Sequence, residues 1–135
     1  CGGTPVVVET QRPNPCASED ISEFIIAMDD ITERFEDVTL LAENTSPENL
    51  KPIIEEMQVI EKEFENIDVP PCALRAKAAF ESYFFSRSQC HFHIYAVEGL
   101  GYTRPPEFRE RKMDLCGLAL EQLEYYNTKI DELRN

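Results

Sequence analysis

Basic residues are scarce in this chain of 135 residues, which carries 13 Lys and Arg against 26 Asp and Glu and a net charge of −13. Nucleic-acid binding depends on neutralising phosphates, so this balance argues against a nucleic-acid partner. Long hydrophobic runs are also lacking, and no segment of the sequence is apolar enough to span a bilayer. The charge is uneven, because residues 18–69 hold sixteen acidic and three basic residues, whereas 70–135 hold nine of each. The acidic half predicts a solvated face, a surface for a cationic partner, or a surface that keeps the domain away from anionic lipid headgroups.

The motifs of common enzymes and metal sites are absent as well. Neither His91 nor His93 has a Glu three residues before it, as a di-iron carboxylate site requires. Cys90-His91 lacks the first cysteine of a covalent haem motif, because position 87 is Arg. There is no Gly-x-Ser-x-Gly elbow and no P-loop. We therefore expect a protein that is not an enzyme and that holds no metal and no cofactor.

Four segments carry apolar residues at alternating three- and four-residue spacing, the pattern of amphipathic helices in a bundle. Prolines and glycines at their borders end one helix and allow the next to begin. The predicted helices span about 18–44, 46–68, 71–98 and 105–134. Short connections and a seven-residue period predict an all-α fold, an up-and-down antiparallel four-helix bundle formed by residues 18–135.

Residues 1–17 differ from the rest, because they contain three prolines and two glycines and show no helical period. We expect them to form an extended, flexible tether. The chain begins Cys1-Gly2-Gly3, followed by a stretch rich in Thr, Pro and Val. This start resembles the mature form of a bacterial lipoprotein, which begins at a lipidated cysteine. The resemblance covers only the start of the chain, and it implies that Cys1 carries acyl chains such as palmitate. Such chains would anchor an extracytoplasmic, secreted protein to the membrane.

Five cysteines are many for a chain of this length and fit an oxidising compartment, where disulfides persist. Apart from Cys1, the remaining four allow three pairings. In the predicted bundle, Cys16 and Cys72 lie at one pole, and Cys90 and Cys116 lie at about the same level of adjacent antiparallel helices. We therefore predict the disulfides Cys16–Cys72 and Cys90–Cys116. The alternative for the second pair is two reduced thiols in the core.

The loop after the third predicted helix contains Leu100, Tyr102 and Arg104, and Arg109 and Arg111 follow it closely. Tyr and Arg are favoured at binding interfaces. This loop lies at the pole opposite the predicted tether, so it points away from the membrane. We expect these five residues to contact a protein or envelope partner. The alternative is an ordinary loop with charged residues at a helix start.

The third predicted helix suggests a different function. Phe85 and Phe92 lie seven residues apart, off the main apolar stripe, and Arg87 and His91 lie four apart. The two rings either pack inside the protein or form an exposed aromatic patch. Together the four residues would line a pocket in a small-ligand or cofactor carrier. The leading hypothesis remains a non-enzymatic, membrane-tethered protein that presents a binding surface, and the carrier is the alternative.

Overall fold

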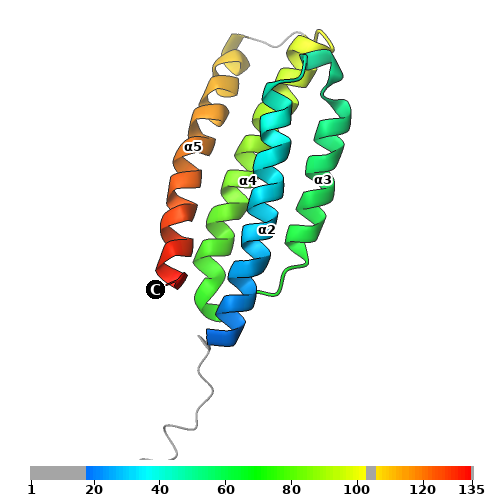
Figure 1. Cartoon of the computed structure of the whole chain (residues 1–135). Coiled ribbons are helices and arrows are strands. Elements are labelled where there is room, and N and C mark those ends of the chain that lie inside the picture. The colour runs from blue at the N-terminus through cyan, green and yellow to red at the C-terminus, as the bar shows by residue number, and fades with distance from the viewer. Residues whose placement is uncertain (1–17, 103–105, 135) are drawn as a thin grey trace, which may run out of the picture.

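The computed structural model describes residues 18–102 and 106–134, and it describes side chains for all of these except 106–114. Four long helices dominate this part of the chain: α2 (Ser18–Glu43), α3 (Lys51–Glu65), α4 (Leu74–Ile94) and α5 (Pro106–Arg134). Figure 1 shows them side by side, with α2 and α4 running up from the blue end of α2, and α3 and α5 running down. No strand occurs among the described residues. The predicted all-α helical bundle is confirmed, and the predicted tether 1–17 lies outside the described residues.

Short turns of tighter or wider helix occupy the connections: the 3-10 turns η1 (Pro47–Asn49) and η2 (Pro71–Ala73), and the π-helical turn η3 (Tyr95–Gly99). The helix predicted over 46–68 is therefore split, and α3 begins only at Lys51. The reason is Pro52, which lacks an N–H donor and so fits only the first turn of a helix. The helix predicted over 71–98 is likewise η2, α4 and η3 in succession.

The apolar stripes predicted from the sequence form the core. In α2, six of the seven predicted inward residues are buried and Val38 is half-buried. Phe35 lies at the centre of an aromatic cluster: its ring stacks on that of Phe84 with centroids 4.1 Å apart. Phe80 extends the cluster to Phe64 of α3 and to Tyr126 of α5, each 5.0 Å away between centroids. The cluster thus joins all four helices, and burial of each ring contributes about 2 kcal/mol.

An ion pair that includes an arginine joins α2 to each of the other three helices. The pairs are Arg34 with Glu63 of α3, Glu43 with Arg87 of α4, and Asp29 with Arg134 of α5. Such partly exposed pairs add about 1 kcal/mol or less each. Their positions help to fix how α2 sits against its neighbours.

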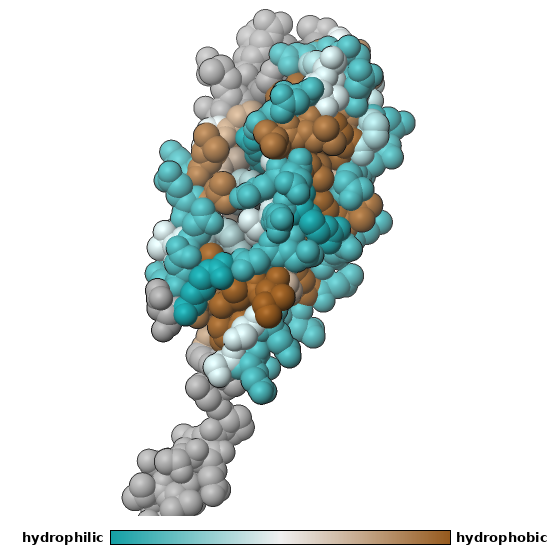
Figure 2. Space-filling view, in the orientation of Figure 1, coloured by the Kyte–Doolittle hydropathy of each residue, from teal (hydrophilic) through white to brown (hydrophobic). Residues whose placement is uncertain are grey.

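The face of the bundle that carries α2 is mainly hydrophilic, with separate hydrophobic areas (Figure 2). Acidic residues account for much of the polar surface of α2. Exposed apolar residues of this helix are Ile26, Leu40 and Leu41. None of the helices within 18–102 and 106–134 has the length and apolarity needed to cross a membrane.

Candidate functional site

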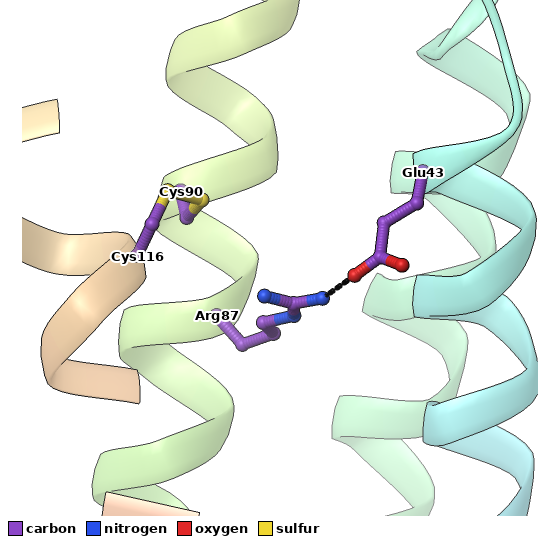
Figure 3. The surroundings of a disulfide bond; sticks show 4 residues. All are labelled: Glu43, Arg87, Cys90 and Cys116. Atoms are coloured by element: carbon purple, nitrogen blue, oxygen red, sulfur yellow. Dashed lines mark hydrogen bonds and ion pairs between the residues drawn. A yellow bond between two sulfur atoms is a disulfide. The ribbon is translucent and has the colours of Figure 1, made fainter. Parts of the chain in front are cut away.

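A disulfide joins Cys90 of α4 to Cys116 of α5, with their Cα atoms 5.2 Å apart (Figure 3). This pairing was predicted from the level of each residue along its helix and is confirmed. Cys72, in the turn η2 just before α4, is also disulfide-bonded. Cys16, its predicted partner, lies outside the described residues, as does Cys1.

The distal loop, which we define as Leu100–Tyr102, leaves η3 at the pole opposite the start of α2 (Figure 1). Leu100 and Tyr102 expose 52% and 64% of their surface. The backbone N–H of Leu100 donates to the carbonyl of Tyr95 at 2.9 Å, and that of Tyr102 donates to Ala96 at 3.0 Å. Gly101 has φ = 76°, a conformation that glycine adopts without strain. These contacts hold the backbone of the loop against η3.

The close packing of η3 on η1 further fixes this pole. A methyl group on Gly99 would lie 2.5 Å from the carbonyl oxygen of Pro47 and 3.1 Å from Cα of Glu48. Only glycine lets these two backbone segments approach so closely. The exposed residues of the distal loop therefore rest on a base formed by two helical turns.

The predicted basic residues beside this loop are only partly described. Arg104 lies outside the described residues. Arg109 and Arg111 belong to α5, but their side chains lie outside the described part of the structure. Of the five residues predicted to bind a partner, the structure thus places Leu100 and Tyr102 together on an exposed loop.

The four residues predicted to line the pocket of a small-ligand carrier lie on different sides of α4, so the structure does not bring all four together. Arg87 is largely covered and pairs with Glu43 of α2 (Figure 3), and His91 is buried. Phe85 and Phe92 are 61% and 47% exposed on the outer side. Each residue turns the helix by about 100°, so positions 85 and 92 share one face, whereas 87 and 91 share another.

His91 is unusual for a buried residue. Its Nε2 atom has no hydrogen-bond partner. Burial in the core lowers the pKa of His91 to about 4, and the positive charge of Arg87 acts in the same direction. The imidazole is therefore neutral at physiological pH and behaves as a core side chain. No sequence pattern marked it as buried, because α4 is apolar on several sides.

A groove of about 650 Å³ runs between α3 and α4, and it was not predicted from the sequence. Its floor contains Phe64 and Phe84, and a second hollow extends it past Met57 to Phe92. Both hollows include Phe84, Phe85 and Glu61, so we treat them as one feature, the α3–α4 groove. The exposed rings of Phe85 and Phe92 form the α4 side of this groove.

Carboxylates border the α3–α4 groove. Glu61 and Glu65 come from α3, and Glu81 comes from α4. The sequence offered no signal for them, because an acidic residue beside a groove resembles any other acidic residue of a solvated face. In the described ranges 18–102 and 106–134, no group of three His, Cys, Asp or Glu residues could hold a metal ion.

The chain matches no protein-family model, no curated protein and no solved structure.

Proposed function

We propose that the chain is a non-enzymatic binding protein, tethered to a membrane through a lipid on Cys1 and presenting a surface to a protein of the cell envelope or its surroundings. The observation that carries this proposal is the exposure of Leu100 and Tyr102 on a backbone that is already fixed. A pre-ordered loop loses little conformational entropy when a partner binds. Tyrosine adds a large contact area with only two rotatable side-chain bonds.

Two cysteine observations support an extracytoplasmic location. The Cys90–Cys116 bond and the bonded state of Cys72 are typical of proteins from oxidising compartments. The resemblance of the Cys1-Gly2-Gly3 start to mature bacterial lipoproteins supports an anchor at the same side of the membrane. Two or more acyl chains on one residue would hold the protein firmly at a bilayer.

Crosslinking in intact cells of the native host tests the binding surface. A photoreactive amino acid replaces Tyr102 in the full tethered chain, and a matched control places it at Leu120, which is 59% exposed on α5. We expect an adduct with one envelope or external protein from position 102 and not from position 120. The variant Tyr102→Ala should then lower capture of the identified partner about tenfold. Equal labelling from both positions would reject the distal loop as the binding surface.

The anchor is tested separately by metabolic labelling with a fatty acid in the same host. We expect label on the native chain and none on the Cys1→Ser variant, which should also leave the membrane fraction. Unlabelled native chain would reject the lipid anchor without affecting the proposed binding surface.

A further inference from the structure

We propose that the α3–α4 groove is a second binding surface, which takes an amphipathic helix of a partner protein with basic residues on both sides of an apolar stripe. This inference rests on the proposed function as a binding protein and names a partner chemistry for a surface other than the distal loop. It is carried by the combination of exposed aromatic side chains and free carboxylates along one groove.

The shape of the groove matches a helix. Its α4 residues extend from Lys77 to Phe92, a length of about 22 Å at the rise of an α-helix. This length accommodates about four turns of a partner helix. Phe85 and Phe92 are seven residues apart, so their rings lie about 10 Å apart along α4. A partner helix repeats its apolar residues at the same interval.

The floor of the groove and part of its α4 side are apolar. Phe64, Phe84 and Met57 are buried in the floor and supply a rigid apolar base. Phe85 and Phe92 retain much of their surface in water, at 61% and 47%. A partner that covers these rings would remove exposed aromatic surface from water. Aromatic residues of this kind are enriched among the strongest contacts of protein interfaces.

The negative charge along the groove favours a positively charged partner. Glu61, Glu65 and Glu81 border it, and none of these carboxylates is in an ion pair or hydrogen bond in the described chain. The one basic lining residue, Lys77, is already engaged, because its Nζ atom lies 5.3 Å from the centroid of the Phe64 ring and 3.4 Å from the Ile67 carbonyl oxygen. Lysines or arginines on both flanks of a partner helix would therefore meet opposite charge.

Binding of a synthetic probe tests this inference on the purified, oxidised chain. The probe is a fluorescent peptide of about 16 residues with leucines at i, i+4, i+7 and i+11 and lysines on both flanks. Fluorescence anisotropy should show saturable binding of this peptide. A peptide with glutamates in place of the lysines, and a peptide with the same composition in scrambled order, should bind at least about tenfold more weakly.

Variants distinguish the groove from general attraction to an acidic protein. The double variant Phe85→Ser with Phe92→Ser should lower the affinity for the probe at least about tenfold, although the net charge of the protein does not change. The control Leu120→Ser removes an exposed apolar residue of α5 and should have no effect. Circular dichroism and the urea midpoint establish that each variant remains folded. Equal binding by the native chain and the double Phe variant would overturn the inference.

A second pair of variants tests the charge. The double variant Glu61→Lys with Glu81→Lys should lower the affinity for the lysine-flanked peptide at least about tenfold. The control is Glu33→Lys with Asp37→Lys, which makes an equal change of charge on the exposed face of α2. This control should lower the affinity less than about threefold. Equal losses in both variants would show that the probe senses net charge only and would overturn the groove assignment. The Tyr102→Ala variant should bind the probe normally. Failure at the groove with successful crosslinking at Tyr102 would leave the proposed function intact.

Discussion

Helix α4 packs against α5 on one side and against α3 on the other, and these two contacts differ. The α4–α5 contact is close and is crosslinked by Cys90–Cys116. Small buried side chains, including Ala79 and Ser86 on α4 and Ala119 on α5, suit this close approach. The α3–α4 contact is more open and leaves Phe85 at its edge. The difference teaches that one helix can serve both as part of a closed core and as the wall of an open groove.

Substitution of two adjacent phenylalanines would test how sharply α4 divides these roles. Phe84→Ala removes a ring that stacks on Phe35 and should lower the free energy of unfolding by about 4 kcal/mol. Phe85→Ala removes an exposed ring and should change it by about 0.5 kcal/mol or less. Urea denaturation of each variant measures both values. Comparable losses at the two positions would show that the α3–α4 contact is closed in solution.

Removal of the crosslink would test whether the α4–α5 contact depends on it. The bond closes a loop with a sequence separation of 26, so Cys90→Ser with Cys116→Ser should destabilise the fold by about 3.5 kcal/mol in the chain-entropy model. Urea denaturation at pH 7 without reductant gives this value and leaves the bond at Cys72 intact. An unchanged midpoint would mean that side-chain packing alone holds the two helices together.

Acidification would test the buried side of α4 through His91, which lies seven residues after Phe84 and shares its helical face. Well above pH 6.5 the imidazole is neutral in both the folded and the unfolded chain. Between pH 6.5 and about 4 the unfolded chain binds a proton that the folded chain does not. The free energy of unfolding therefore decreases as the pH is lowered through this range. The loss should reach about 3 kcal/mol near pH 4 and then level off.

The His91→Gln variant provides the control for this pH effect, because it cannot bind the proton. Urea midpoints measured from pH 7 to pH 4 should fall more steeply for the native chain than for the variant. Parallel curves would show that His91 is accessible to protons in the folded state. Arg87 and Glu43, the charged groups that act on His91, remain unchanged in this comparison.

A smaller effect is expected at the pole that joins the two pairs of helices. In Gly99→Ala the new methyl group meets the backbone of Pro47, so η1 and η3 must separate. Overpacking of this kind should cost about 2 kcal/mol, measured by urea denaturation. Gly117→Ala is a matched control, because a Cβ atom there meets nothing within 4 Å and the residue lies in α5. This control should be neutral or stabilising, since alanine favours helix.

The sequence predicted the fold well where a helix has one apolar side. The stripe of α2 from Ile21 to Ala42 and the level of Cys90 and Cys116 follow from helical spacing alone, and both agree with the structure. The buried side of α4 was harder to predict, because this helix carries apolar residues on several of its sides. Periodicity therefore did not separate the buried Phe84 from the exposed Phe85.

The binding surfaces were predicted only in part. Leu100 and Tyr102 were identified from residue type and from the glycines around them. The α3–α4 groove depends on how far two helices stand apart, which no local pattern encodes. Arg87 interrupted the apolar stripe of its helix, and only the structure places it beside Glu43 of α2. Long-range pairs of this kind arise from tertiary packing.

The position of the Cys90–Cys116 bond determines how the protein responds to proteolysis. The bond encloses η3, the distal loop and the beginning of α5 in one covalent ring. A single cut anywhere between residues 91 and 115 would leave both fragments attached to each other. A nicked molecule would therefore keep its last helix, and the exposed distal loop could be cleaved once without loss of the bundle.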